Sequence, residues 1–263
     1  MRPGGAAITM LVVVMSLGAC APSASQEPIE ITVFAAASLS NALDAAARAY
    51  GDTDAGTAIT VSTDSSAALA TQIAEGAPAD VFLSADTTNP QALVDAGLVD
   101  GDAVPFAGNE LTIITPTGNP AALDSPFDLA TAGTRVIAAG DEVPITKYAT
   151  RLVENLAADP AAPADFVAAY VANIVSKEDN VSAVRTKIEL GEGDAAIVYV
   201  TDAAASDTVA TIEVPDAANV SATYAAVVVK ASAHAPAARA FLGWLTSPDG
   251  RAILGDFGFL PPP

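Results

Sequence analysis

The sequence contains few of the residues on which most enzyme active sites and metal sites depend. It has one cysteine, Cys20, and one histidine, His234. A single cysteine excludes an intramolecular disulfide, and one cysteine with one histidine argues against a His/Cys metal site. A Gly-x-Ser-x-Gly nucleophile elbow and a Ser-x-x-Lys pair are also missing. We therefore expect no catalysis, no cofactor and no binding site for a free metal cation.

Positive charge is scarce as well. Lysine and arginine together number 11 against 31 acidic residues, which gives a net charge of −20. A surface of this sign argues against binding to nucleic acid and against adhesion to anionic lipid headgroups. If the ligand is itself an anion, the field of the whole protein cannot attract it, so local donors must hold it.

The one long apolar run, residues 6–15, is too short to span a membrane. With the basic Arg2 before it and small residues after it, it predicts a secretory signal peptide over residues 1–19. The segment Leu17-Gly-Ala-Cys20 resembles a bacterial lipobox, which implies a lipid-anchored, extracytoplasmic protein attached to the cell membrane through Cys20. The alternative is ordinary cleavage with an incidental cysteine. Residues 20–28 are small and polar and predict a tether.

Apolar periodicity in the rest of the chain alternates between strand and helix. The predicted strands are 29–36, 59–62, 81–83, 111–115, 136–138, 195–200 and 224–229. The predicted helices cover 39–50, 65–74, a segment from 89, 144–159, 181–188 and 241–245. Such alternation favours an α/β fold of parallel-rich sheets flanked by helices.

The mature chain is long for one doubly wound sheet, so we expect two lobes with a ligand cleft between them. Residues 29–107 and 215–263 form the predicted lobe 1, and the inserted residues 108–214 form lobe 2. The chain would cross between the lobes near Gly108-Asn109 and Val214–Asp216.

Small or polar residues stand at several predicted helix starts. Ser38 and Ser66 open two helices, and residues 143–145 and 179–181 open two more. Each helix start presents N–H groups without internal partners and a positive dipole end. Several of them around one cleft would bind an anion without lysine or arginine. The structural alternative is that each serine simply caps its own helix.

Longer segments carry a family resemblance. The segment 31–39, Ile-Thr-Val-Phe-Ala-Ala-Ala-Ser-Leu, and the segment 65–86 with its Gly-Ala-Pro-Ala-Asp core resemble the bacterial molybdate-binding proteins, as do shorter fragments as far as Gly258-Phe259. The resemblance implies the two-lobe periplasmic-binding-protein fold (type II) and high-affinity capture of molybdate or tungstate. It also implies a monomer that delivers its ligand to an ABC transporter permease with a cytoplasmic ATPase.

Carried over by position, the resemblance implies five ligand-binding residues. These are the hydroxyls of Ser38, Ser66 and Tyr199 and the backbone N–H groups of Ile145 and Val181. This chain departs from the family in two places. Asp64 precedes the second serine loop, where a carboxylate repels an anion unless it turns away to cap the helix. Ile145 is bulkier than the residue common at that point and would tighten the pocket.

Other ligands remain open at this point. A sulfate or tungstate site would use the same donors. A ferric site requires a pair of tyrosines, and an organic-acid site usually requires an arginine. Neither a tyrosine pair nor an arginine is expected in the cleft loops. A secreted hydrolase and a purely structural lipoprotein are further alternatives.

Overall fold

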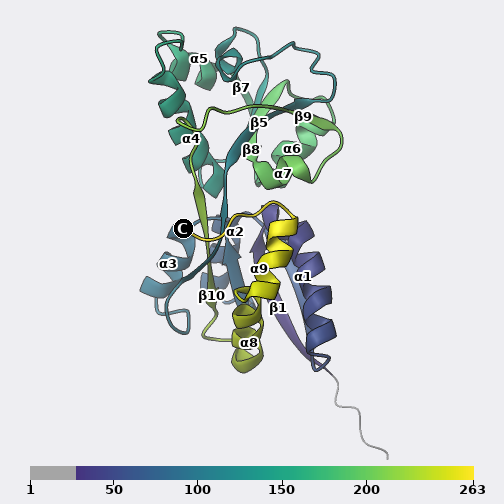
Figure 1. Ribbon diagram of the computed structural model, residues 1–263. Coiled ribbons are helices and arrows are strands. Elements are labelled where there is room, and N and C mark those ends of the chain that lie inside the picture. The colour runs from purple at the N-terminus through teal and green to yellow at the C-terminus, as the bar shows by residue number, and fades with distance from the viewer. Residues whose placement is uncertain (1–27) are drawn as a thin grey trace, which may run out of the picture.

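The computed structural model describes residues 28–263, which form two lobes, one above the other in Figure 1. The predicted signal peptide, the lipidation site Cys20 and the tether up to residue 27 lie outside the described residues. Each lobe contains one five-stranded sheet covered by helices. The predicted two-lobe α/β fold is therefore confirmed.

The sheet of lobe 1 has the strand order β2-β1-β3-β10-β4. Its strands are β1 (Ile29–Ala36), β2 (Thr57–Asp64), β3 (Val81–Ser84), β4 (Val104–Asn109) and β10 (Ala222–Val228). The helices of this lobe are α1 (Ser40–Thr53), α2 (Ser66–Ala74), α3 (Thr88–Asp95), α8 (Ala235–Leu245) and α9 (Pro248–Asp256). A 3-10 turn, η1 (Ala37–Leu39), separates β1 from α1.

The sheet of lobe 2 has the order β7-β6-β8-β5-β9. Its strands are β5 (Leu111–Pro116), β6 (Val136–Ala139), β7 (Ile174–Glu178), β8 (Ala195–Tyr199) and β9 (Val209–Ile212). The remaining helices are η2 (Pro126–Ala130), α4 (Pro144–Ala157), α5 (Phe166–Asn173), α6 (Val181–Glu189) and α7 (Val200–Ala204). The predicted lobe limits at 107/108 and 214/215 stay a prediction, because the sheets alone do not define where a lobe ends.

Both sheets are mixed, and the reason lies in the crossings between lobes. Strands β1, β2 and β3 pair in parallel, as do β6, β7 and β8, whereas β10 and β5 run antiparallel to their neighbours. Strands β5 and β10 each follow a crossing, so they start at the cleft and run away from it. The parallel strands end at the cleft in both lobes, which is where open α/β sheets bind ligands.

Burial follows the apolar pattern of the sequence. On α4 the apolar face is buried against the sheet of lobe 2, from Tyr148 and Leu152 to Leu156. In lobe 1, the partly buried Trp244 of α8 packs on Tyr50 at the edge of the core, with ring centroids 5.2 Å apart. Within residues 28–263, none of the helices is both long and apolar enough to cross a membrane.

The Gly-Ala-Pro-Ala-Asp segment, residues 76–80, has a structural role. The Asp80 carboxylate accepts hydrogen bonds from the Thr32 N–H (2.7 Å) and from the Ser232 hydroxyl. It thereby ties β1 to the segment that follows β10. The side chain of His234 nearby is 43% exposed.

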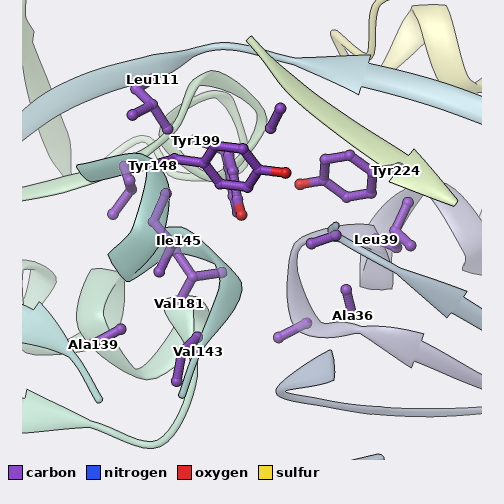
Figure 2. Packing of buried hydrophobic residues seen from close by; sticks show 14 of the residues in the cluster. Ala36, Leu39, Leu111, Ala139, Val143, Ile145, Tyr148, Val181, Tyr199 and Tyr224 are labelled. Atoms are coloured by element: carbon purple, nitrogen blue, oxygen red, sulfur yellow. The ribbon is translucent and has the colours of Figure 1, made fainter. Parts of the chain in front are cut away.

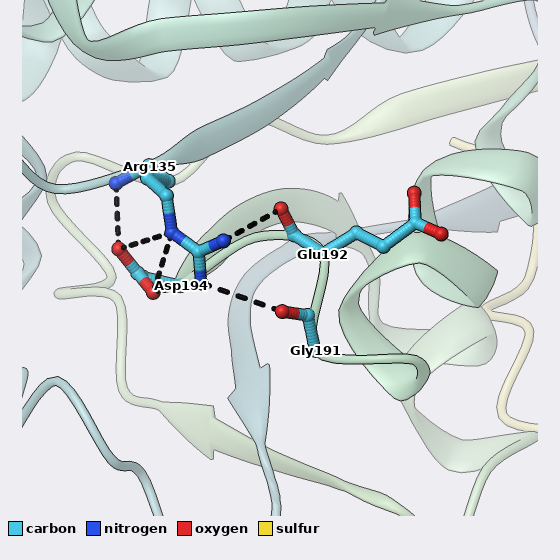
Figure 3. A network of polar contacts seen from close by, with 4 residues as sticks. All are labelled: Arg135, Gly191, Glu192 and Asp194. Atoms are coloured by element: carbon cyan, nitrogen blue, oxygen red, sulfur yellow. Dashed lines mark hydrogen bonds and ion pairs between the residues drawn. The ribbon is translucent and has the colours of Figure 1, made fainter.

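The turn at residues 191–194 follows α6 and leads into β8. Gly191 has a φ of +71°. The Arg135 guanidinium donates to the carbonyls of Gly191 and Glu192 and forms an ion pair with Asp194 (2.8 Å; Figure 3). The turn thus presents acceptors to an arginine, whereas a phosphate-cradling loop would present N–H donors.

Candidate functional site

A small cavity lies between the lobes, where the ends of β1 and β8 meet the starts of three helices. All five predicted ligand residues line it, and the structure thus brings them together from both lobes; its lining consists of Ala36, Ala37, Ser38, Asp64, Ser65, Ser66, Ala85, Val143, Pro144, Ile145, Asn180, Val181 and Tyr199. Figure 2 shows Val143, Ile145 and Val181 across a gap from Ala36. Whether the five residues bind a ligand stays a prediction.

Ser66 is held as a hydrogen-bond donor. It is the first residue of α2 and is buried, and its Oγ accepts a hydrogen bond from the N–H of Ala85 (3.0 Å). A backbone N–H can only donate, so this contact uses a lone pair of the hydroxyl and leaves its proton free. Ser66 can therefore donate that proton to an oxygen atom in the cavity.

Neither predicted serine caps its helix through its side chain. The N-cap of α1 is Leu39 and that of α2 is Ser65, and neither makes a side-chain capping bond. Ser38 lies inside the η1 turn, with its Oγ 2.9 Å from the Tyr224 hydroxyl. The capping prediction is wrong because a 3-10 turn separates β1 from α1, which moves Ser38 out of the cap position.

Lobe 2 presents main-chain donors. Val181 is the first residue of α6, and Ile145 is the second residue of α4 after Pro144. The N–H groups of the first helical turn have no acceptor inside the helix and mark its positive end. The side chains of both residues are buried in the core. The Ile145 side chain packs in the hydrophobic core of the protein as well as lining the cavity, so the core accommodates part of its bulk.

Tyr199 ends β8 and is 1% exposed. Its hydroxyl has no hydrogen-bond partner among residues 28–263. Burial raises the pKa of Tyr199 well above its ordinary value, with smaller contributions from Tyr224 and Tyr148, so the phenol keeps its proton. An unsatisfied buried donor of this kind costs about 1–3 kcal/mol. An oxyanion in the adjoining cavity would provide the acceptor.

Asp64 lies in the cavity wall, and its side chain does not turn away to cap α2. Its Oδ1 accepts the N–H of Ser65 (2.7 Å) and the Nδ2 amide of Asn180 (3.2 Å). Asn180 belongs to lobe 2, where its own Oδ1 caps α6 by accepting from the N–H of Ala183 (3.0 Å). Asp64 therefore places a negative charge beside the cavity and joins the two lobes across it.

The comparisons with known proteins agree with this geometry. Residues 31–260 match the family of bacterial extracellular solute-binding proteins. This chain belongs to that family. The molybdate-binding protein ModA of Mycobacterium tuberculosis is 36% identical over 233 residues, which cover 88% of this chain and 85% of that protein. A Bacillus subtilis protein assigned as an ABC transporter substrate-binding lipoprotein is 27% identical over 237 residues, 89% of this chain and 88% of its own.

Solved structures give the same fold for this solute-binding protein. A substrate-binding domain attributed to a molybdenum ABC transporter of Clostridium difficile has a TM-score of 0.65 at 28% identity and covers 89% of this chain and 99% of its own. The sulfate-binding protein SubI of Mycobacterium tuberculosis has a TM-score of 0.77 at 24% identity, and the match covers 89% of this chain and 87% of that protein. The second likeness concerns the fold alone.

A tyrosine pair lies beside the small cavity of this solute-binding protein, in strands and not in the cleft loops, where none is expected. Tyr199 and Tyr224 do form a tyrosine pair, with ring centroids 5.7 Å apart. Tyr224 lies in the middle of β10, so a search of loops alone misses it. Burial raises the pKa of both phenols, which disfavours the phenolate that a ferric ion requires. The described residues also hold no cluster of three or more His, Cys, Asp or Glu side chains suited to a metal ion.

An arginine also lies beside the cleft, on helix α6 and not in the cleft loops, where none is expected. Arg185 lines a wider interlobe cavity of about 790 Å³ beside the small one. Its Nε lies 3.1 Å from Glu189, and its guanidinium also donates to the carbonyl of Asp202 (3.4 Å). Burial raises the pKa of the Asp202 carboxyl to about 7. Arg185 is thus engaged by acceptors of its own lobe and does not line the small cavity.

Proposed function

We propose that this protein captures molybdate outside the membrane and delivers it to an ABC permease driven by a cytoplasmic ATPase. The proposal rests on one observation, the convergence of hydroxyl and main-chain donors from both lobes on one small cavity. Within residues 28–263, the lining of that cavity includes no lysine or arginine. Neutral, preorganised donors would therefore hold the anion, which suits a protein with a net charge of −20.

The donor chemistry favours an anion without protons. Ser66 and Tyr199 have protons to give, as do the N–H groups of the helix starts. Molybdate, tungstate and sulfate accept at every oxygen, whereas phosphate carries a proton near neutral pH and needs an acceptor. The 36% identity to a molybdate-binding protein supports molybdate among these ions. Sulfate or tungstate is the alternative ligand.

The expected affinity is sufficient for a scavenging protein. Five hydrogen bonds to a charged ligand, each worth about 1.5–3 kcal/mol, give a gross term of about 8–15 kcal/mol. Lobe movement and the lost freedom of the ligand subtract several kcal/mol. The micromolar range requires about 8 kcal/mol, which the five donors reach when each contributes near the upper end of its range.

Ligand entry requires the lobes to move. The cavity measures about 10 Å³, which is about the space for one water molecule and less than a tetrahedral oxyanion needs. Contacts across it include Asp64 with Asn180 and the Ser182 hydroxyl with the carbonyl of Ala37 (3.4 Å). We infer that the lobes separate to admit the anion and close on it, and that the permease recognises the closed form.

The remaining parts of the proposal concern the context of the protein. We propose that it acts as a monomer and that Cys20, outside the described residues, carries the lipid anchor. The lipoprotein of Bacillus subtilis among its relatives supports the anchor. Membership of a solute-binding family supports a role in binding, with no catalysis.

Thermal melts of residues 28–263 with molybdate, tungstate, sulfate or phosphate test the ligand. At about 1,000 times its dissociation constant a ligand adds about 4 kcal/mol of stability, or roughly 8–16 °C in Tm for a chain of this size. We expect this rise with molybdate and tungstate. A rise with sulfate alone would move the protein to sulfate transport, and no rise with any of the four ions would refute an oxyanion ligand.

A further inference from the structure

A chain of buried polar side chains leads from Ser38 to the segment between the lobes. The Ser38 Oγ lies 2.9 Å from the Tyr224 hydroxyl. The Asn109 amide donates to the Tyr224 hydroxyl (3.2 Å) and to the hydroxyl of Thr201 (2.9 Å). Tyr224, Asn109 and Thr201 are all buried. None of these three residues lines the small cavity, yet together they determine what Ser38 can offer to it.

The orientation of the Asn109 amide follows from a main-chain contact. Its Oδ1 accepts the N–H of Glu110 (3.0 Å), and a backbone N–H can only donate. The nitrogen must therefore face Tyr224 and Thr201, and each of these hydroxyls receives one of its two hydrogens. The Asn109 amide is thus the donor at the start of this series of hydrogen bonds. The contact with Glu110 fixes which of its two side-chain atoms is the nitrogen.

The proton of Tyr224 then has one acceptor. Its oxygen already accepts from Asn109, and Ser38 is its other partner among the described residues. If Ser38 donated to Tyr224 instead, the phenol proton would be buried without an acceptor, which is costly. Burial also raises the pKa of Tyr224 above its ordinary value, so the phenol retains the proton it donates.

We propose that Asn109 and Tyr224 are positioning residues that hold Ser38 as a hydrogen-bond donor toward the ligand. This inference rests on the proposed function. The amide of Asn109 donates to Tyr224, Tyr224 donates to Ser38, and the proton of Ser38 is left for the anion. Ser66 reaches the same state by accepting from the N–H of Ala85. Both serines of lobe 1 thus select a ligand that only accepts, and they disfavour one that carries a proton.

The packing around Tyr224 makes this arrangement rigid. Its ring contacts Phe106 and Phe259 edge to face, with centroids 6.2 and 5.4 Å away, and also packs against Tyr199. The other branch of the chain ends at Thr201, two residues after Tyr199 in the sequence. The Asn109 amide, at the end of β4, thus also binds a hydroxyl of α7 in lobe 2.

A double-mutant cycle tests the inference. Dissociation constants for molybdate and sulfate are measured by calorimetry on the purified protein and on Tyr224→Phe, Ser38→Ala and the double variant. We expect Tyr224→Phe alone to weaken molybdate binding about fivefold to tenfold, because Ser38 loses the bond that orients it. In the Ser38→Ala background the same change should cost less than about twofold. Tyr50→Phe, a buried tyrosine of lobe 1 far from the cavity, is the matched control and should bind like the parent.

Equal losses from Tyr224→Phe in both backgrounds would overturn the inference, because a merely structural tyrosine acts independently of Ser38. Failure of the parent protein to bind any oxyanion would refute the proposed function instead, so the two failures are distinguishable.

Asn109→Asp gives a second readout. The carboxylate can still accept from Glu110 but cannot donate to Tyr224, so the direction of the chain reverses and Ser38 presents a lone pair. We expect molybdate and sulfate binding to weaken and the preference for sulfate over phosphate to fall about tenfold or more. An unchanged preference in a variant that melts as a folded protein would contradict the inference.

Discussion

Lobe 1 and lobe 2 present donors to the same cavity by different means. Lobe 1 uses serine hydroxyls that already take part in internal hydrogen bonds, Ser66 with Ala85 and Ser38 with Tyr224. Lobe 2 uses N–H groups at the starts of α4 and α6, and the Tyr199 hydroxyl, which has no partner within residues 28–263. In lobe 1 side-chain bonds orient the donors, whereas in lobe 2 helix geometry and packing do so.

The difference separates stability from binding. A hydroxyl of lobe 1 satisfies a group of the protein and, in the proposed function, the ligand as well, so its loss should reduce both stability and binding. Tyr199 satisfies no group of the described chain, so its hydroxyl costs stability until a ligand arrives. A main-chain donor needs only a backbone N–H, which every residue except proline has. Isoleucine and valine can therefore occupy positions 145 and 181.

The largest expected effect comes from paired variants, one in each lobe. Ser66→Ala and Tyr199→Phe should each weaken molybdate binding about 10- to 100-fold, because each removes a hydrogen bond to a charged ligand. Their effects on the ligand-free protein should differ in sign. Ser66→Ala leaves the Ala85 N–H buried without its acceptor and lowers Tm, whereas Tyr199→Phe removes an unsatisfied hydroxyl and raises or keeps it. Calorimetry and thermal melts measure both, and a fall of Tm in both variants would contradict the comparison.

A smaller effect is expected when a main-chain donor is removed. Val181→Pro deletes one N–H at the first position of α6, where proline is well tolerated. Asn180 before it has φ −155° and ψ 168°, the extended conformation that a residue preceding proline prefers. We expect about tenfold weaker molybdate binding with helix α6 intact by circular dichroism.

Val181→Ala is the control, because it keeps the N–H and deletes only buried side-chain atoms. It should lower Tm and leave the dissociation constant within about threefold. Loss of binding in this variant, with binding retained in Val181→Pro, would mean that the side chain and not the backbone acts in the site.

The smallest effect concerns the contact that joins the lobes. Asp64→Asn removes a negative charge from the cavity wall, and the new amide oxygen can still accept from Ser65. We expect molybdate to bind about threefold more tightly at low salt, with the gain shrinking as ionic strength rises. Weaker binding in titrations at both salt concentrations would show that the stronger hydrogen bonds which the charged carboxylate accepts from Ser65 and Asn180 matter more than its repulsion of the anion.

The sequence predicts much of the fold, because long apolar patterns define most elements. Strand β1 has the predicted bounds, 29–36. Strand β4 was missed, since Pro105 and Gly108 interrupt its pattern, and Gly108 is required there because a Cβ would lie 2.9 Å from the carbonyl of Pro261. Strand β7 is a five-residue edge strand with weak burial, too short for a periodic signal.

The site was less accessible to sequence reasoning. The five donors came from family resemblance, and each taken alone has a structural explanation. Tyr224 and Asn109 were missed because a buried tyrosine in an apolar strand is typical of a core. A signal did exist for Asn109, since it is a polar residue at the end of a buried segment where the chain crosses between lobes. Only the three-dimensional contacts reveal the direction of its hydrogen bonds.

The central claim is that donors of both lobes bind one oxyanion. The most direct measurement is a crystal structure of the protein grown with molybdate, in which anomalous scattering locates the molybdenum atom. We predict one peak between the lobes, with oxygen atoms about 2.6–3.2 Å from Ser66 Oγ, the Tyr199 hydroxyl and the Val181 nitrogen. A peak that contacts one lobe alone, or one in the wider cavity beside Arg185, would contradict the account.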